Sequence, residues 1–166
     1  MNFTDLATKE IIASTISALA KNGITAELVQ TRDEAKKKAL SLIPEGVEVM
    51  TMTSISLEET GIEAEINSSK KYKSVRNMLN SMNRDTENRE MQKLGAAPEW
   101  ALGSVHAVTE QGEVVVTSGT GSQLPAYLYG ASHVLWVVGT QKIVKNIAEA
   151  MTRIEEYLIP LESVRA

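Results

Sequence analysis

The stretch that decides the fold is residues 94–141, LGAAPEWALGSVHAVTEQGEVVVTSGTGSQLPAYLYGASHVLWVVGTQ. It contains no Lys or Arg, and its only acidic residues are Glu99, Glu110 and Glu113. Because charged side chains are rarely buried, a stretch that nearly avoids them is expected to form the centre of the core. VHAVTE and EVVVTS, separated at residues 111–112, predict a β-hairpin, and the apolar run 133–139 predicts a strand covered on both faces.

The elements on either side of this stretch predict an α/β fold with helices packed on a mostly parallel sheet. Hydrophobic periodicity predicts helices over 4–21, 32–42, 71–80, 86–94 and 145–158, and strands over 24–29 and 47–53. Thr31 and Glu34 have capping-box spacing, and Pro160 is expected to end the last helix. The order 24–29, 32–42, 47–53 predicts a parallel pair of strands with a right-handed crossover.

Length and composition predict one domain over residues 1–166, with a helical excursion at about 67–94. Residues 70–93 carry seven basic and three acidic side chains, which is typical of a solvated helical segment. No apolar run is long enough to span a membrane and the first residues lack a secretory signal, so a cytoplasmic protein is expected.

The rarity of cysteine, histidine and positive charge excludes several classes of site and partner. The chain has no cysteine, which excludes disulfides, thiolate zinc sites and Cys-ligated iron–sulfur clusters held by this chain. Its two histidines are too few for a three-His metal site, so neither a metal nor a cofactor is predicted. A net charge of −4 and few aromatic residues argue against nucleic acid and anionic membranes as partners.

Three loops at predicted strand ends are candidates for chemistry, because ligands of such sheets bind beyond the carboxyl ends of strands. In loop 53–61, Ser54 and Ser56 can form an anion site with free backbone N–H groups, or Ser56 and Glu59 can simply cap a short helix that ends at Gly61. Glu58 in this loop is a candidate general acid–base, although a solvated acidic face is the alternative.

The second loop, 118–125, combines glycines with hydroxyl side chains, which suits a phosphate or a carboxylate. Its candidate ligand-binding residues are Ser118, Thr120, Gly121, Ser122 and Gln123. It lacks the Gly-Lys-Ser/Thr of a Walker loop, and an ordinary flexible turn is the alternative.

The third loop, 139–142, ends in Lys142, and two further candidates lie in the central stretch. Lys142 is placed to neutralise an anion or form a Schiff base, or else is a solvated lysine that opens a helix. His106 alternates with apolar residues in a strand and either faces a cleft or is a structural histidine. Glu110 is a candidate general base or a solvated hairpin-end acid.

Several of these segments together resemble the LUD (lactate-utilisation) domain family. The resemblance lies in GSVHAVTEQG (103–112), VVVTSGTGSQLP (114–125), HVLWVVGTQKIV (133–144) and the loop TSISLEETG (53–61). It implies a three-layer α/β/α fold similar to that of glucosamine-6-phosphate deaminase, ribose-5-phosphate isomerase and coenzyme A-transferases. It also implies a link to bacterial oxidation of L-lactate to pyruvate, in which a LUD-domain subunit accompanies iron–sulfur partner proteins. Ser54, Ser56, Glu58, Glu110 and Ser122 match the family's loops and are carried over as ligand-cleft residues.

Three functions are open from the sequence. In the first, the chain is an accessory LUD subunit that binds a small carboxylate or an iron–sulfur partner. In the second, it is a stand-alone isomerase- or transferase-like enzyme acting on a phosphorylated or carboxylated metabolite. In the third, the basic 70–93 segment docks an acidic partner. A homodimer is plausible for each.

Overall fold

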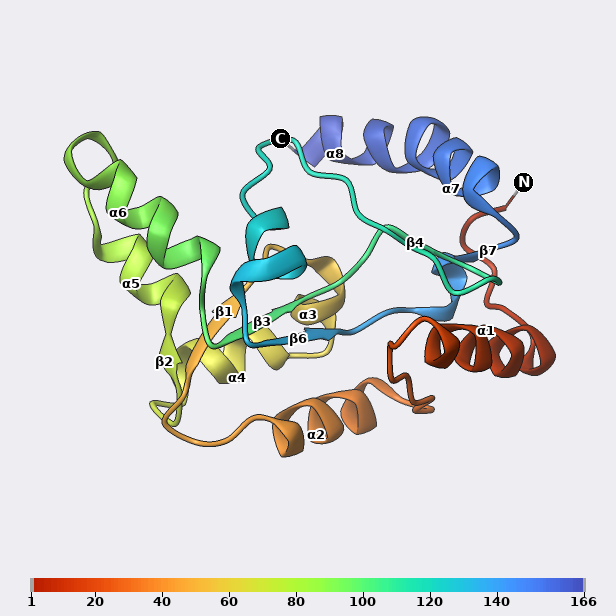
Figure 1. The fold of residues 1–166 in the computed structure, drawn as a ribbon, viewed down its shortest axis with the longest axis horizontal. Helices are drawn as coiled ribbons and strands as arrows, with labels where there is room; N and C mark the ends of the chain where they lie inside the picture. The colour runs from red at the N-terminus through yellow and green to blue at the C-terminus, as the bar shows by residue number, and fades with distance from the viewer. Residues whose placement is uncertain (1, 166) are drawn as a thin grey trace. The chain divides into compact units, whose positions relative to one another are not determined.

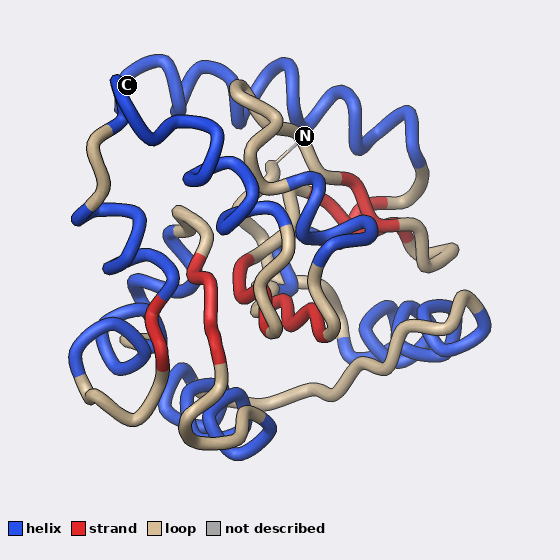
Figure 2. The backbone as a smooth tube through the Cα atoms, turned by 60° about the vertical axis from the view of Figure 1, so that its left-hand side comes forward, coloured by secondary structure: helices blue, strands red, loops and turns tan. Residues whose placement is uncertain are grey.

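The computed structural model describes residues 2–165, which form two compact units. Unit 1 comprises the chain up to Leu28, residues 105–117 and the chain from Val138 onward; unit 2 comprises residues 29–104 and 118–137. Strands are short, and most of the backbone is helix or loop (Figure 2). No described helix has the length and apolar character needed to cross a membrane.

Unit 2 is built on a parallel sheet whose strand order is β2-β1-β3-β6 (Figure 1). The strands are β1 (Glu48–Thr51), β2 (Lys73–Ser74), β3 (Trp100–Gly103) and β6 (His133–Trp136). Side chains alternate along each strand, so Val49 and Leu102 face one side of the sheet, whereas Met50 and Ala101 face the other. The apolar run 133–139 does contain a strand, but β6 lies at the edge of the sheet and is half-buried, so the predicted full covering of this strand is wrong.

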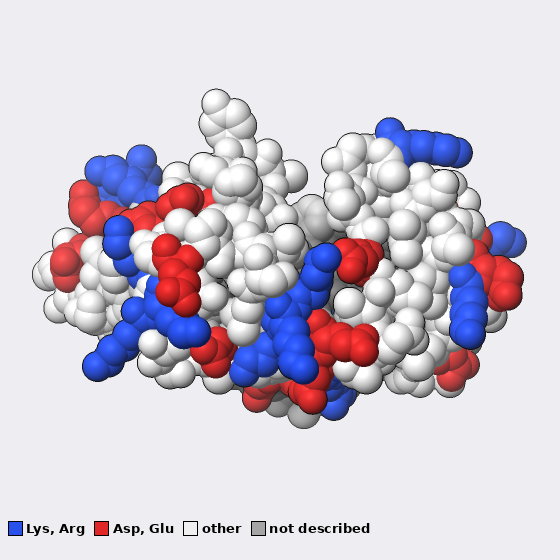
Figure 3. All heavy atoms as spheres, turned by 90° about the horizontal axis from the view of Figure 1, so that it is seen from below, with Lys and Arg blue, Asp and Glu red and all other residues white. Residues whose placement is uncertain are grey.

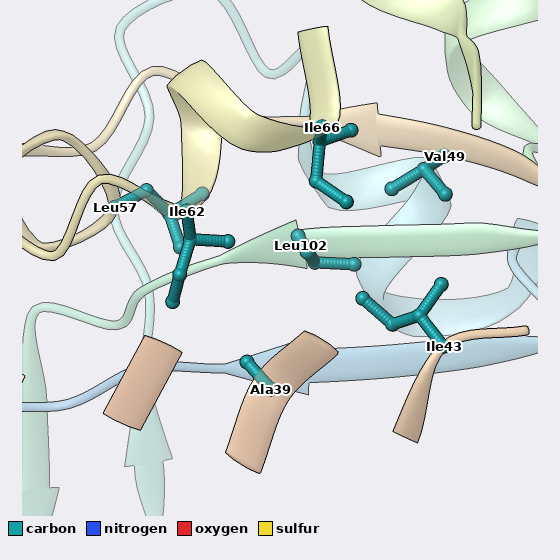
Figure 4. Packing of buried hydrophobic residues seen from close by; sticks show 7 residues of the cluster. All are labelled: Ala39, Ile43, Val49, Leu57, Ile62, Ile66 and Leu102. Atoms are coloured by element: carbon teal, nitrogen blue, oxygen red, sulfur yellow. The ribbon is translucent and has the colours of Figure 1, made fainter. Parts of the chain in front are cut away.

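The first face of this sheet carries the main hydrophobic core. It packs against α2 (Arg32–Leu42), α3 (Ile55–Glu59) and α4 (Ile62–Ser68). Figure 4 shows the side chains of these helices converging on the two strands at the middle of the sheet. The buried cluster consists of Ala39, Ile43, Val49, Leu57, Ile62, Ile66 and Leu102.

The second face lies on the side of α5 (Val75–Ser81), α6 (Arg84–Ala96) and the π-helical turn η1 (Ala126–Gly130). Tyr127 of η1 meets Trp136 of β6 edge-on, with ring centroids 5.5 Å apart. A Cβ atom at Gly103 would lie 1.7 Å from the Tyr127 hydroxyl, so only glycine fits there. Helices on both sides of a parallel sheet make the three-layer α/β fold that the sequence predicted.

Unit 1 contains α1 (Lys9–Lys21) and a three-stranded sheet of order β5-β4-β7. The strands β4 (Ala107–Thr109) and β5 (Val114–Val115) form the predicted antiparallel hairpin, and β7 (Ile143–Val144) runs parallel to β4. After η2 (Thr140–Lys142) and β7, the chain continues as α7 (Ile147–Arg153), the π-helical η3 (Ile154–Leu158) and α8 (Ile159–Arg165). Ala107, Val144 and Ala150 form a buried cluster.

Arg153 lies inside unit 1 and is only 2% exposed. Its Nε atom donates to the carbonyl of His106 at 3.0 Å, and a terminal nitrogen donates to the carbonyl of Phe3 at 2.8 Å. The guanidinium also lies over the rings of Phe3 and Tyr157, 5.5 and 4.9 Å from their centroids. Burial lowers its pKa, and Tyr157 partly opposes that effect. This arginine therefore joins the N-terminal segment, β4 and α7.

The predicted strand at 24–29 is wrong, because this segment is a loop that pairs with no strand among residues 2–165. The alternation that suggested a strand is present: Ile24 and Ala26 are half-buried, and Thr25 and Glu27 are exposed. Alternation of apolar and polar residues is typical of a chain with one covered side. It does not show whether a neighbouring strand is present to form backbone hydrogen bonds. The parallel neighbours of β1 are β2 and β3, so the predicted 24–29/47–53 pair does not form.

The expectation that Pro160 ends the last helix is also wrong, because Pro160 is the second residue of α8. The π-helical turn η3 comes immediately before it, and the N–H of Ile159 bonds back to the carbonyl of Ile154, five residues away. A proline ring in an α-helix clashes with the carbonyl four residues earlier, and a widened turn relieves that clash. The chain therefore stays helical to residue 165.

Candidate functional site

A groove of about 930 Å³ lies in unit 2, on the second face of its sheet. It is formed by the end of β1, the α5–α6 hairpin and the loop before η1. The strand order reverses at β1, because the chain goes from β1 to β2 on one side and then to β3 on the other. Ligands of open α/β sheets bind at such a reversal, beyond the carboxyl ends of the strands. This groove is therefore the candidate site.

The charges around the groove are all positive. Its lining includes Arg76, Arg84, Arg89 and Lys93, and it contains no Asp, Glu or His among the residues that the structure describes. Elsewhere basic and acidic side chains lie next to one another, as on the face shown in Figure 3. Lys93 is paired with Glu90 at 3.2 Å. Within residues 2–165, Arg76 and Arg84 form no ion pair, so both can bind an anion.

Arg76 is held in place by the end of β1. Its Nε and one terminal nitrogen donate to the carbonyl of Thr51, at 3.1 and 2.6 Å. This carbonyl is accessible because β2 ends at Ser74, opposite Val49, and does not extend far enough to pair with Thr51. Burial lowers the pKa of Arg76, and the negative charge of Glu63 partly opposes that shift. The second terminal nitrogen has no hydrogen-bond partner in the described part of the chain.

The start of α5, which carries Arg76, is fixed by a polar network. The hydroxyl of Ser74 accepts the N–H of Asn77 at 3.1 Å and donates to Asn67 at 2.6 Å. Asn67 in turn donates to the Thr51 hydroxyl at 3.2 Å. Capping by Ser74 and the amide of Asn67 therefore attach α5 to β1 and α4, which orients the guanidinium of Arg76.

The apolar part of the groove is rich in methionine. Met50 and Met52 come from β1 and the residue after it, Met82 follows α5, and Met91 lies on α6. With Leu79 they form the apolar lining. Methionine side chains are unbranched and adapt to different ligand shapes. The groove therefore offers an adaptable apolar surface together with positive charge.

The loop that precedes η1 enters this groove, as the sequence analysis expected of a ligand loop. Thr120, Gly121, Ser122 and Gln123 all line it, whereas Ser118 does not. The Ser118 hydroxyl accepts the N–H of Gly121 at 3.0 Å, and the hydroxyls of Thr120 and Ser122 are 2.9 Å apart. Ser118 thus shapes the loop, and the other four residues face the groove.

The loop after β1 contributes Thr53 to the groove, but not the residues singled out in the sequence. Ser54, Ser56 and Glu58 are outside its lining. Ser54 is the N-cap of α3, and its hydroxyl accepts the N–H of Leu57 at 3.4 Å. The predicted Ser56–Glu59 capping pair is therefore wrong, because the helix begins two residues earlier than that spacing required. Thr53 and the 120–123 loop nevertheless meet in one groove.

The remaining candidates, His106, Glu110 and Lys142, belong to unit 1. The Nδ1 atom of His106 accepts the N–H of Thr117 at 3.1 Å, and Lys142 donates to the carbonyl of Val105 at 3.0 Å. The pKa of His106 is lowered by burial first and then by the nearby positive charge of Lys142; the negative charge of Glu162 opposes this shift, and Arg153 adds a smaller lowering effect. Glu110 is half-buried, and its N–H bonds to β7. The structure thus brings His106 and Lys142 near each other in unit 1.

The sequence analysis missed the basic residues of the α5–α6 hairpin as site residues. The feature of the sequence that pointed to these residues was the excess of positive charge over residues 70–93, which was interpreted as a solvated face. The side chains of Arg84, Arg89 and Lys93 are indeed exposed. They acquire a second role because the hairpin faces the loop before η1 across the groove. No cluster of three metal-ligating side chains occurs among residues 2–165.

The parallel sheet, the helices on its faces and the groove at the reversal of strand order define a three-layer α/β protein with a candidate ligand-binding groove at its strand ends. The LUD domain family profile matches residues 12–166. Because the match extends over nearly the whole chain, this chain belongs to the LUD domain family. No curated protein and no solved structure in the comparisons matches it.

Proposed function

We propose that the chain is a cytoplasmic LUD-domain subunit of a bacterial system that oxidises L-lactate to pyruvate, and that it binds a small carboxylate in the groove of unit 2. Membership of the LUD domain family supports the metabolic context. The observation that carries the binding role is the groove's charge, with four cationic side chains and no carboxylate among the described lining residues.

The part of the groove nearest β1 suits a hydroxy acid. One terminal nitrogen of Arg76 is available to a carboxylate, and charge-assisted hydrogen bonds of this kind are the strong ones. Thr53, Thr120 and Ser122 line the same groove and offer hydroxyls that both donate and accept. A 2-hydroxy acid has one group for each: a carboxylate for the guanidinium and a hydroxyl for the side-chain oxygens.

The oxidation itself needs an electron acceptor outside this chain. Converting lactate to pyruvate removes two electrons and two protons, and the sequence has no cysteine to hold an iron–sulfur cluster. We therefore assign the acceptor to an iron–sulfur partner protein. The isolated chain is expected to bind lactate without turnover and to co-purify with such a partner when the two are co-expressed. Turnover by the isolated chain would instead support the stand-alone enzyme.

Calorimetric titration with L-lactate, pyruvate and uncharged lactamide tests the binding site. We expect both acids to bind and lactamide not to bind. Arg76→Gln is expected to weaken binding about tenfold or more, the range for a lost hydrogen bond to a charged group. Arg32→Gln is the matched control, because Arg32 belongs to unit 2, forms an exposed ion pair with Glu59 and lies outside the groove.

Two results would contradict this assignment. One is equal binding of lactate and lactamide, and the other is equal loss of affinity in the Arg76 and Arg32 variants. Because Arg76 also holds the Thr51 carbonyl, the thermal midpoint of each variant is measured alongside the titration. Arg76→Lys, which keeps the positive charge, is expected to retain part of the affinity.

A further inference from the structure

The groove is longer than a small carboxylate requires. Its lining on α6 extends from Arg84 to Ala96. At 1.5 Å per residue this part of the helix is about 18 Å long. A three-carbon acid held at Arg76 would leave most of that length unfilled, because volumes near 930 Å³ are typical of sites for much larger molecules.

Arg76, Arg84 and Arg89 line the groove without an ion pair in the described residues, and the first two lie at different ends of the α5–α6 hairpin. Arg76 is the second residue of α5, directly after β2, and so lies beside the sheet. Arg84 is the first residue of α6, after the turn that joins the two helices. Figure 1 shows this hairpin running away from β2, with that turn at its far end. The helix rise over α5 and the turn separate the two arginines by on the order of 10 Å.

Apolar side chains of both helices line the groove between these two positions, alongside the polar lining residues Asn80, Asn88 and Arg89. Leu79 near the end of α5, Met82 in the turn and Met91 in the middle of α6 all line the groove. The acidic residues Asp85 and Glu87 near Arg84 do not line it, and the Glu87 carboxylate accepts the N–H of Asn83. The groove therefore has one guanidinium beside the sheet and another at the turn of the hairpin, and Leu79, Met82 and Met91 supply apolar contacts between them.

We infer that the groove takes an elongated dianion, a ligand with one anionic group near Arg76, an unbranched apolar middle section and a second anionic group near Arg84. This inference rests on the proposed function, because the Arg76 end is the carboxylate site described above. A slender ligand fits better than an acidic helix of a partner protein, since Arg76 is half-buried beside the sheet and not on an exposed surface.

Titration with two matched series of linear acids tests this inference. One series consists of α,ω-dicarboxylates of increasing length, and the other of monocarboxylates in which a methyl group replaces the second carboxylate. We expect affinity in both series to rise with each methylene that becomes buried, by up to about fourfold. Once the chain is long enough, the dicarboxylate is expected to bind about fivefold more tightly, the upper range for an exposed ion pair.

The arginine variants identify which end is responsible. Arg84→Gln is expected to remove the advantage of the long dicarboxylate without changing monocarboxylate binding, and added salt should reduce the same advantage. Arg76→Gln is expected to weaken both series, and Arg32→Gln neither. Because Arg84 is exposed and makes no contact with the core, its replacement leaves folding unchanged.

Equal affinities of the two series at every length, or an unchanged dicarboxylate advantage in Arg84→Gln, would overturn the inference. If lactate still bound and depended on Arg76, the proposed function would stand in that case. If neither lactate nor any acid of either series bound, the proposed function and this inference would both fail. Preferential binding of an acidic helical peptide over the dicarboxylates would also overturn it.

Discussion

The contact between the β4–β5 turn and α1 leads to the sharpest stability prediction for this protein. Gly112 in that turn has φ +83°, and a Cβ atom there would lie 2.6 Å from the carbonyl carbon of Ala18 and 2.7 Å from the nitrogen of Leu19. The side chain of Asn22, at the end of α1, donates to the carbonyl of Gly112 at 3.0 Å and to that of the preceding residue at 3.2 Å. Gly112→Ala therefore strains the backbone and pushes the turn away from the helix.

The size of the effect follows from these two terms. An L-residue in the left-handed region costs about 1–2 kcal/mol relative to glycine. Ordinary contact needs 3.4 Å or more, so the turn has to move by about 0.8 Å. That movement breaks the two hydrogen bonds of Asn22, each of which contributes about 1 kcal/mol. Gly112→Ala is thus expected to lower the free energy of unfolding by about 3–4 kcal/mol.

Gly23 supplies the matched control. It also belongs to unit 1 and has φ +79°, but a Cβ atom there would meet nothing within 4 Å. Gly23→Ala is therefore expected to cost only the backbone strain of about 1–2 kcal/mol. Urea unfolding followed by far-ultraviolet circular dichroism measures both variants. Equal losses for Gly112→Ala and Gly23→Ala would refute the close approach of the turn to α1.

Three further predictions concern single buried groups. Because the folded-state pKa of His106 lies below the ordinary value of 6.5, the unfolded chain binds more protons than the folded chain between these two pKa values. The free energy of unfolding is therefore expected to fall as the pH drops through that window. His106→Asn, which keeps an acceptor for the Thr117 N–H, should make the urea midpoint less dependent on pH. Gly103→Ala is expected to cost about 2–3 kcal/mol through overpacking. The cost is expected to be smaller, but not zero, in a Tyr127→Phe background, because the hydroxyl is removed while the ring carbon stays 2.9 Å from the added Cβ; strictly additive costs in this double-mutant cycle would contradict the contact. Arg153→Met is expected to cost about 2 kcal/mol in urea unfolding, because two buried carbonyls lose their donor, and an unchanged midpoint would show that they do not need it.

Sequence reasoning worked best where the structural signal is local. Thr31 caps α2 through the N–H of Glu34, and the helix covers 32–42 as predicted. The hairpin around residues 111–112 and a strand beginning at His133 also form as predicted, although that strand is half-buried at the sheet edge. Each of these depends on capping chemistry, turn chemistry or an apolar run within a few residues, and so each can be inferred from neighbouring positions alone.

Sequence reasoning failed where a distant partner decides the outcome. The segment 24–29 has the alternation of a strand, yet the edge of β1 is occupied by the two residues of β2. Pro160 continues a helix because the turn before it widens. Among the candidate site residues, Thr120 and Ser122 enter the groove, whereas Ser54 and Ser118 hold their own loops together.

The amino-acid sequence by itself determined the class of fold and the family, because composition, periodicity and motif spacing are properties of the chain. Only the tertiary structure decided that Arg76 and Arg84, separated by a helix and a turn, line one groove with Thr53 and Thr120. The physical reason is that a binding site depends on which side chains are brought together across a sheet edge. That arrangement follows from strand order and helix packing, which no local pattern encodes.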